Sequence, residues 1–586
     1  MKIFLAYRSG RPGAGDYFAR MMPVGLGYIN AALRHGGFDS RLANLSAVSW
    51  RQAADLLRRE KPDLLGLTMY TFNRHASLKV AAAAKAANRR CFVVAGGPHA
   101  SHLPRTLLMG CHALDAVATG EGEAVMLDLA RCLSSGGDPR SVPGIHLRDG
   151  GTVISTGARD VIASLDTLPF PAPYHEGFHL DVTAEAGFII TSRGCPGGCT
   201  FCNTPEFWGA RMRFRSAASV VEEFTHLARE KGILYVSVRD DTFTVHRKRL
   251  LELCDRLHEA RLGVLWNCQS RVTAIDEERL LAMRRAGCEV VQYGVESGSP
   301  RIMRLLGKNT TVAQARAAAV ATRKVGMHLS VYLISAIPGE TDEDFEATAT
   351  LLRKMRPHDA IVAPLAVYPG TALWEEYGRT HGVDDSFWMK EKREALYAMD
   401  AGGCRRSHER MARLCREVMR PAGGRREMDA ASKALLSAVD AACAGEGAMT
   451  ATGTAYTRQE LESHKALMPD AFTPLLSSGL AYEVEGHLGD ALEEYATILR
   501  REPGNPWGLI RSAAILMASG DPDGASIFAS ELVKAHPRYA QGHALLAEVH
   551  LAAGKRARAR SAARAALSLD PNDRLAARLL RALGRT

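Results

Sequence analysis

Short apolar runs alternate with stretches of helical spacing over the first 133 residues of the chain. The runs KIFLAY, DLLGLTMY, CFVVAGG and DAVATG are separated by segments such as GYINAALRHGG, which has the apolar spacing of a helix. This alternation predicts an α/β domain over residues 1–145, built on a doubly wound, Rossmann-like and mostly parallel sheet. Ligands of such sheets bind beyond the carboxyl ends of the strands, so we expect a ligand at the loops after Tyr70, Gly97 and Gly120.

A second series of apolar runs follows a connector over residues 146–183. The connector contains a predicted hairpin around Asp149–Gly151 and a proline-rich exit, LPFPAPY. The later runs are GFIITSRG, LYVSVRDD, VLWNCQS, CEVVQYGVES, HLSVYLISAIPG and AIVAPLAVYPGT, each separated from the next by a helical segment. Six such βα units predict a partial (β/α)6 barrel over residues 184–395, with chemistry at the C-terminal ends of its strands.

The C-terminal region repeats itself every 34 residues in three registers. The pattern predicts two short helices in each unit, with small residues where the helices pack closely and a proline after the second helix. The prolines are Pro503, Pro537 and Pro571, the glycines Gly486, Gly520 and Gly554, and the alanines Ala491, Ala525 and Ala559. This pattern resembles a tetratricopeptide repeat solenoid over residues 471–586, after a helical linker over 396–470. Such arrays bind peptides or protein partners, or brace another domain.

Length and composition indicate an ordinary globular protein of several domains. A chain of 586 residues is too long for one core, and 46% hydrophobic with 24% charged residues is typical of a folded soluble chain. The N-terminus reads as a strand rather than a secretory signal, and no apolar run is long enough to span a membrane. We therefore expect a cytoplasmic protein whose 12 cysteines are mostly reduced.

Much of the net charge of +10 gathers in the segment from Cys404 to Glu427. Its arginines are interleaved with Glu409, Glu417 and Glu427, and no aromatic residue stands among them to stack on bases. We interpret the segment as a solvated helical face. No nucleic-acid partner is expected.

Three cysteines form the only cluster of this residue type in the sequence. Cys195, Cys199 and Cys202 follow a predicted strand, and the prolines and glycines between them make the chain wrap tightly. Three thiolates from one loop can hold three corners of an iron-sulfur cubane and leave the fourth iron open to a substrate. A zinc knuckle is the alternative, but it requires a fourth ligand, which residues 212–219 do not offer.

The run C-P-G-G-C-T-F-C from Cys195 to Cys202 resembles the radical S-adenosylmethionine (SAM) superfamily. The resemblance implies a [4Fe-4S] cluster that cleaves SAM to a 5'-deoxyadenosyl radical, with electrons from a reductant such as flavodoxin or ferredoxin. No side chain beyond the cofactor ligands is then expected to act as an acid or base.

The same resemblance assigns SAM contacts to residues at the barrel strand ends. It implies that Asp240 or Asp241 accepts hydrogen bonds from the SAM amino group and that Arg271 pairs with the SAM carboxylate. An acidic residue at a strand end can instead be a helix N-cap, and a surface ion pair would explain Arg271 equally well.

Two further strand ends complete the implied SAM site. Glu296 suits the ribose hydroxyls, since a carboxylate accepts two hydrogen bonds at once, and Ser297 beside it is a further implied SAM contact. Backbone groups at Pro338 and Gly339 suit adenine. For Glu296 the helix N-cap is again the structural alternative.

Motifs in the first domain resemble the cobalamin-binding (B12-binding) domain that precedes many radical SAM barrels. They are P-V-G-L-G-Y from Pro23, P-D-L-L-G-L-T from Pro62, the GGPHAS loop and the GEGE turn. The implied cobalamin contacts are Tyr70, Thr71, Gly96, Gly97, Gly120 and Glu121.

The D-x-H-x-x-G signature, which supplies a histidine to cobalt in other cobalamin proteins, is absent from the first domain, and His99 lies in a loop of a different sequence. We therefore expect base-off cobalamin with no histidine on cobalt, its lower face covered by the loop from Met69 to Phe72.

The resemblance favours a cobalamin-dependent C-methyltransferase acting on a small molecule or a peptide. A non-methylating relative that uses the radical for cyclisation, rearrangement or oxidation is the enzymatic alternative. An adaptor protein with an inactive barrel is the alternative from another class, and the intact cysteine triad argues against it.

Overall fold

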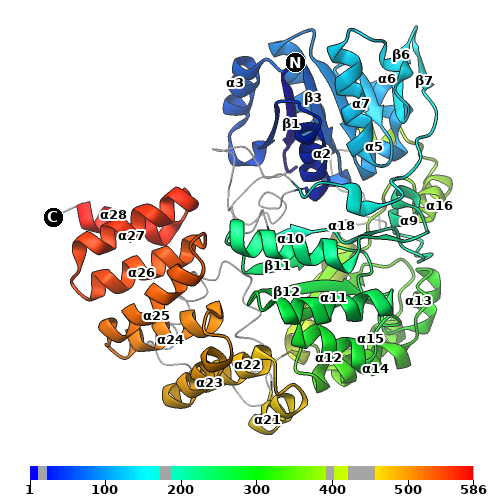
Figure 1. Cartoon of the computed structure of the whole chain (residues 1–586). Helices are drawn as coiled ribbons and strands as arrows, with labels where there is room; N and C mark the ends of the chain where they lie inside the picture. The colour runs from blue at the N-terminus through cyan, green and yellow to red at the C-terminus, as the bar shows by residue number, and fades with distance from the viewer. Residues whose placement is uncertain (11–22, 172–186, 391–400, 420–455, 585–586) are drawn as a thin grey trace.

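The computed structural model describes residues 1–10, 23–171, 187–390, 401–419 and 456–584 of the chain (Figure 1). A sheet with helices on both faces, in blue and cyan, is followed by a green barrel of strands and helices and by an orange to red array of paired helices (Figure 1). The α/β fold class and the C-terminal helical array are as the sequence predicts.

The first sheet has the strand order β2-β1-β3-β4-β5-β6-β7. The strands β1 to β5 are parallel, and β6 and β7 form an antiparallel hairpin at one edge. Their bounds are β1 Ile3–Tyr7, β2 Ser40–Asn44, β3 Leu64–Thr68, β4 Phe92–Gly96, β5 Ala116–Ala118, β6 Ile145–Asp149 and β7 Thr152–Ser155. Sequence analysis missed β2 because its sequence, SRLAN, has too few apolar residues. The predicted hairpin is present, but it belongs to this sheet, which therefore extends past residue 145.

Helices cover both faces of this sheet. One face packs on α2 (Val24–His35) and α7 (Gly122–Ser134) through an apolar cluster that includes Leu26 and Leu129. The other face packs on α3 (Trp50–Glu60), α4 (Arg74–Ala87), α5 (Pro98–His102) and α6 (Pro104–Gly110) through a separate cluster. Two distinct cores on one parallel sheet are what a doubly wound fold requires.

The barrel has six parallel strands in the order β15-β14-β13-β12-β11-β8, and the two end strands do not pair. All six lie where the apolar runs predict them. Their bounds are β8 Phe188–Ile189, β11 Tyr235–Val238, β12 Leu265–Ser270, β13 Cys288–Glu296, β14 His328–Ser335 and β15 Asp359–Pro364. The covering helices are α10 Ala217–Glu230, α11 Arg247–Ala260, α12 Glu277–Arg285, α13 Pro300–Leu305, α14 Val312–Lys324 and α15 Asp342–Met355.

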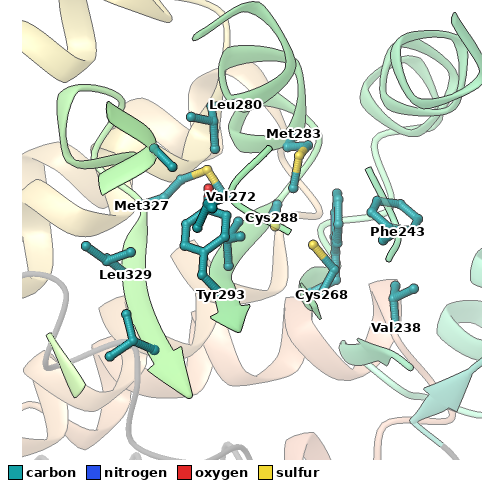
Figure 2. Packing of buried hydrophobic residues seen from close by; sticks show 14 of the residues in the cluster. Val238, Phe243, Cys268, Val272, Leu280, Met283, Cys288, Tyr293, Met327 and Leu329 are labelled. Carbon is teal, nitrogen blue, oxygen red and sulfur yellow. The ribbon is translucent and has the colours of Figure 1, made fainter. Parts of the chain in front are cut away.

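The barrel core lies between the strands and these helices. Figure 2 shows Cys268, Cys288 and Tyr293 pointing from their strands toward Met283 and Met327 in this layer. The two cysteines are fully buried, as expected of small core residues. The alternate residues along β12 and β13 therefore point into the barrel.

Short elements connect the barrel to the first sheet. The pair β9 (Ser192–Arg193) and β10 (Arg213–Phe214) flanks the cysteine loop and α9 (Thr204–Trp208). Beyond β15, α16 (Ala372–His381) and α17 (Phe387–Lys390) insert Trp374 and Trp388 into the core of the first domain. The helix α18 (Ala401–Val418) packs on β14, β15 and α15, so this part of the predicted 396–470 linker belongs to the barrel layer.

The helical pairs of the C-terminal array follow the predicted period. They are α22 Phe472–Val484 with α23 Leu488–Arg501, α24 Pro506–Ala518 with α25 Pro522–Ala535, and α26 Ala540–Ala552 with α27 Arg556–Leu569; α21 Arg458–Leu467 precedes them and α28 Arg574–Gly584 follows. At Gly479 an added Cβ would lie 2.4 Å from Cε1 of Tyr495, so glycine is required for the close approach of the two helices.

The array packs against the N-terminal ends of the barrel strands. Leu234 and Leu265, at the start of β11 and β12, share an apolar cluster with residues of α22 to α26. The indole Nε1 of Trp507 donates a hydrogen bond of 2.7 Å to the carbonyl of Gly263. Among the described residues, no helix combines the length and apolar character that crossing a membrane requires.

Candidate active site

A cavity of about 700 Å³ lies between the first sheet and the barrel. Its wall on the first domain includes strand-end glycines and the side chains of Leu26, Tyr70 and Met126. Its wall on the barrel comes from α9 and from residues that point into the barrel; these are Phe207, Trp208, Arg239, Asn267, Gln269, Gln292, Tyr332 and Ile361. The cavity thus joins the carboxyl ends of the strands of both domains.

Backbone rather than side chain forms much of the wall on the first domain. Of the six predicted cobalamin contacts, Tyr70, Gly96, Gly97 and Gly120 line the cavity. At Gly97, φ is +92°, and an added Cβ would lie 2.9 Å from the hydroxyl oxygen of Thr68, so a side chain there would be strained and crowded. Such a cradle lets a wide, flat ligand approach the main chain, and these residues therefore fit cobalamin.

Thr71 and His99 pair with each other and are absent from the cavity wall. The Thr71 hydroxyl lies 3.1 Å from Nδ1 of His99, and the His99 ring meets Trp388 edge to face at 5.4 Å. Burial, reinforced by the charge of Arg74, holds the pKa of His99 well below its ordinary value. The Thr71 hydroxyl is engaged by this buried histidine, and its predicted contact with cobalamin stays a prediction.

Glu121 is also turned away from the cavity, into an ion-pair network between the two domains. We call Glu121, Glu123, Arg193 and Arg213 the domain clamp. Nη1 of Arg193 lies 2.6 Å from Oε1 of Glu121, Nη2 of Arg193 contacts Glu123, and Nη1 of Arg213 lies 2.9 Å from Oε2 of Glu121. Burial by itself raises the pKa of Glu121, but hydrogen bonding to Arg213 and the charge of Arg193 bring it below its ordinary value. Glu121 is therefore a structural anion.

The cysteine loop begins two residues after Arg193 of the clamp. Gly194 has φ +102°, and the Cys195 amide donates to the carbonyl of Gly209 at 3.3 Å. The amide of Thr200 donates to the carbonyl of Leu306 at 3.0 Å, which fixes the middle of the loop against α13. The thiols of Cys195, Cys199 and Cys202 are free and partly exposed.

The donor set of this loop fits an iron-sulfur cubane. In the described residues, no three His, Cys, Asp or Glu side chains are placed to hold one metal ion. A cubane has a different requirement, since its three thiolates bind three separate irons.

The two predicted aspartates differ sharply in their surroundings. Asp240 is 1% exposed, and it accepts hydrogen bonds of 2.6 Å from the amide and hydroxyl of Thr191 and from the hydroxyl of Ser192. Its carboxylate thus ties β11 to the turn between β8 and β9, which argues against its predicted SAM contact. Asp241 is in contact with solvent at the surface. Partial removal of its carboxyl from bulk water, followed by the charge of Asp240, raises its pKa to about 6, although the Thr204 hydroxyl donates a hydrogen bond of 3.1 Å to it.

Arg271 lies beside the cysteine loop. A Cβ added to Gly197 would lie 2.7 Å from Nη1 of Arg271 and 3.3 Å from Sγ of Cys195. The guanidinium is therefore adjacent to the loop that would carry the cluster, as its predicted contact with the SAM carboxylate requires.

Glu296 has a strained backbone and a lysine partner that sequence analysis did not foresee. Its φ is +64°, which non-glycine residues rarely adopt, and Nζ of Lys308 lies 2.7 Å from Oε1. Oε2 has no hydrogen-bond partner among the described residues, so it can still accept from a ligand hydroxyl. Ser297, in contrast, is buried and bonds to Thr348 at 3.1 Å, which is a structural role.

The loop after β14 presents Pro338, Gly339 and Glu340. Gly339 has φ +71°, and its carbonyl accepts a hydrogen bond of 2.6 Å from Arg301. Oε1 of Glu340 is buried without a hydrogen-bond partner among the described residues. Burial, followed by the charge of Asp344, raises the pKa of Glu340 to about 7.

Sequence analysis missed the polar residues inside the barrel. The cavity wall contains Asn267, Gln269, Gln292 and Tyr332, which stand at alternate positions within apolar strands. Polar residues at every second position could have indicated these side chains in the sequence, because alternate residues of a strand point to opposite faces and these face away from the apolar core.

Family models match three parts of the chain. The Radical SAM superfamily matches residues 189–352, the B12 binding domain matches residues 11–130, and a tetratricopeptide repeat matches residues 485–549.

Curated relatives agree with these matches. An uncharacterized methyltransferase of Pyrococcus horikoshii is 33% identical over 358 residues, covering 60% of this chain and 78% of the relative. The anaerobic magnesium-protoporphyrin IX monomethyl ester cyclase of Rubrivivax gelatinosus is 27% identical over 390 residues, covering 64% and 70%. The chain therefore belongs to the radical SAM enzymes that carry a B12-binding domain. Its cofactors are a [4Fe-4S] cluster, SAM and cobalamin.

Solved structures show the same fold at low sequence identity. The radical SAM methyltransferase TsrM from Kitasatospora setae, with cobalamin and a [4Fe-4S] cluster, aligns with TM-score 0.60 at 17% identity, covering 80% of this chain and 99% of TsrM. The cobalamin-dependent radical enzyme OxsB, with aqua-cobalamin and SAM, aligns with TM-score 0.57 at 15% identity, covering 97% and 83%.

Proposed function

We propose that this enzyme is a cobalamin-dependent C-methyltransferase and that its substrate occupies the cavity between the two domains. The observation that carries the proposal is the cavity itself, which has a glycine cradle on one side and the open strand ends of the barrel on the other. The methyltransferase among its relatives supports methyl transfer, and the cyclase supports the alternative of cyclisation.

The proposed cofactor contacts follow from the positions of the side chains. Cys195, Cys199 and Cys202 hold the cluster, and Arg271 pairs with the SAM carboxylate. Asp241 is the better placed aspartate for the SAM amino group, because Asp240 is occupied by the turn after β8. Oε2 of Glu296 and the backbone of Pro338 and Gly339 receive ribose and adenine, while Tyr70, Gly96, Gly97 and Gly120 contact cobalamin.

The bound cofactors supply the radical chemistry and the methyl carrier, and the chain's own residues orient the groups and limit access of water. Phe207 and Trp208 contribute apolar surface to the cavity wall near the cysteine loop. The clamp joins the strand before Cys195 to the turn after β5.

The reductant is proposed to be a flavodoxin or ferredoxin. The proposed setting is a reducing cytoplasm, which agrees with free thiols at every cysteine in the described ranges. The helical array packs on the opposite end of the barrel from the cavity, so a partner bound to the array would not enter the cavity directly. The proposed domain limits are 1–155 for the cobalamin domain, 184–419 for the barrel and 456–586 for the array.

Isotope labelling tests the proposed reaction. Reconstituted enzyme should be incubated anaerobically with deuteriomethyl-SAM, a reductant and host extract, and the products should be read by mass spectrometry. Methyl transfer predicts a labelled product together with 5'-deoxyadenosine and S-adenosylhomocysteine. Formation of 5'-deoxyadenosine with an unlabelled product would contradict methylation and support cyclisation or rearrangement.

A further inference from the structure

Two glutamines and a tyrosine form a hydrogen-bonded row in the cavity wall. Gln269 on β12 and Gln292 on β13 are register partners on neighbouring parallel strands. Tyr332 stands on the next strand, β14, and all three side chains line the cavity. We call these residues the amide row.

The hydrogen bonds within the amide row leave the carbonyl of one glutamine and the NH2 group of the other unused. Nε2 of Gln269 donates to the Tyr332 hydroxyl at 3.1 Å, and this hydroxyl donates to Oε1 of Gln292 at 3.1 Å. The hydroxyl thus accepts from the NH2 group of Gln269 and donates its single hydrogen to the carbonyl of Gln292. Oε1 of Gln269 and Nε2 of Gln292 then have no partner among the described residues. Exchanging N and O in both amides interchanges the two roles but preserves one donor and one acceptor.

Other polar side chains of the cavity wall already have contacts of their own. Asn267 accepts a hydrogen bond from Ser237 at 2.7 Å and donates one to Tyr235 at 3.3 Å. The carboxylate of Glu123 pairs with Arg193, and the guanidinium of Arg239 lies 4.6 Å from the ring centre of Phe188. The amide row therefore offers neutral hydrogen-bonding groups to a ligand in the cavity.

We propose that the amide row binds an amide group of the substrate, whose N–H and C=O complement the free carbonyl and NH2 of the two glutamines. This inference rests on the proposed function and names its substrate class, an amide-bearing compound. A peptide bond and a lactam share this chemistry. They differ in geometry, because a peptide N–H and C=O point to opposite sides whereas those of a lactam point to the same side.

Ligand-observed saturation-transfer NMR on the cobalamin-loaded, cluster-reconstituted enzyme tests the proposal without the natural substrate. The probes are N-methylacetamide, which has a trans amide, and 2-pyrrolidinone, which has a cis amide. Their ester counterparts, methyl acetate and γ-butyrolactone, lack the N–H group. We expect one amide to bind about threefold to tenfold more tightly than its ester, the range that one hydrogen bond provides.

Variants of the glutamines localise the effect. The glutamine whose carbonyl is free accepts the N–H of the probe, so its replacement by leucine should remove the preference for the amide; with the bonds above this is Gln269→Leu. The other glutamine donates to a C=O group that amide and ester share, so Gln292→Leu should weaken both probes. Gln292→Glu keeps the shape of the side chain but removes its donor, so it should also weaken both probes even if the leucine variants fold poorly. The matched surface variant Gln459→Leu, at an exposed position of α21, should bind both probes as wild type does. Preference for N-methylacetamide would identify a peptide bond, and preference for 2-pyrrolidinone a lactam.

Equal binding of amides and esters, an amide preference that survives in both Gln269→Leu and Gln292→Leu, or unchanged amide affinity in Gln292→Glu would overturn the proposal. SAM cleavage and cobalamin content are measured on the same samples. Loss of SAM cleavage in wild-type enzyme with the amide preference intact would count against the proposed function and leave the amide site standing.

Discussion

The two ends of the barrel meet their neighbouring domains in opposite ways. At the C-terminal end, buried ion pairs of the clamp stand beside a cavity of about 700 Å³. At the N-terminal end, Leu234 and Leu265 pack directly on the helical array, and Trp507 is 2% exposed. An interface that must admit cofactors cannot be filled with apolar side chains, so ion pairs at its edge hold the two domains together. An interface that only supports the barrel has no ligand to admit, so apolar side chains can fill it completely.

The buried arginines at the two ends show the same difference. Burial by itself lowers the pKa of Arg193, but Glu123 and Glu121 raise it above the ordinary arginine value. Arg284, at the other end, has its pKa lowered by burial; it donates to Ser477 at 2.6 Å and to the carbonyl of Thr473 at 3.2 Å. Arg193 is part of an ionic network, whereas Arg284 donates hydrogen bonds to uncharged groups of the array.

Replacement of a cluster cysteine should have the largest effect and should be confined to the cavity end. Cys202→Ala removes one of the three proposed thiolate ligands, so we expect complete loss of 5'-deoxyadenosine formation with cobalamin binding retained. Iron content, cobalamin absorbance and nucleoside analysis check this. Cys111→Ala, a partly exposed cysteine outside the loop, should behave as wild type. Normal SAM cleavage by Cys202→Ala would exclude the cysteine loop as the cluster site.

Breaking the clamp should cost stability and cofactor alignment together. Arg193→Gln leaves Glu123 buried without its cation, and loss of one member of a buried pair costs about 3–5 kcal/mol. We expect a lower thermal midpoint and an altered magnetic interaction between Co(II) and the reduced cluster in EPR spectra. Arg58→Gln, in an exposed pair with Asp55, should cost at most about 1 kcal/mol. Equal effects of the two variants would show that the clamp does not hold the domains.

Truncation of Trp507 should weaken the contact between the array and the N-terminal ends of the barrel strands without changing SAM cleavage. Trp507→Ala removes a buried indole and its bond to Gly263, with an expected cost of about 3–5 kcal/mol. Hydrogen exchange should rise in the array, while SAM cleavage per folded enzyme should stay near wild type. Ile527→Ala, at a position 66% exposed, is the control and should change little. Loss of SAM cleavage in folded Trp507→Ala would mean that the two ends are coupled.

The smallest effect concerns Glu340 and pH. Its pKa, about 7, lies above the unfolded value, so the folded state binds the extra proton between about pH 4.5 and pH 7. Stability from this group is therefore present at low pH and is lost as pH rises through 7. Glu340→Gln should flatten that loss, making the variant relatively more stable at pH 8 than at pH 5.5. Thermal midpoints of both proteins at pH 5.5 and pH 8 test this expectation. The same change in midpoint with pH in the variant and in wild type would contradict the raised pKa of Glu340.

Much of the site could be predicted because its residues are local in sequence. The three cysteines lie within one loop, and Gly96, Gly97 and Gly120 stand at strand ends that the apolar runs mark. Glu121 and Asp240 lie at the strand ends where they were predicted, and their predicted contacts with cobalamin and SAM stay predictions. Arg193 and Thr191 capture their carboxylates, and such long-range pairs have no periodic signature in a sequence.

The sequence by itself therefore determined the order of the three regions, the repeat period and the candidate cysteine ligands, since each is encoded by neighbouring residues or a regular spacing. Only the tertiary structure decided which side chains face the cavity. The amide row joins three strands, the clamp joins two domains, and the array closes the barrel end opposite the cavity. These arrangements depend on distances between segments that are far apart along the chain, which residue spacing does not specify.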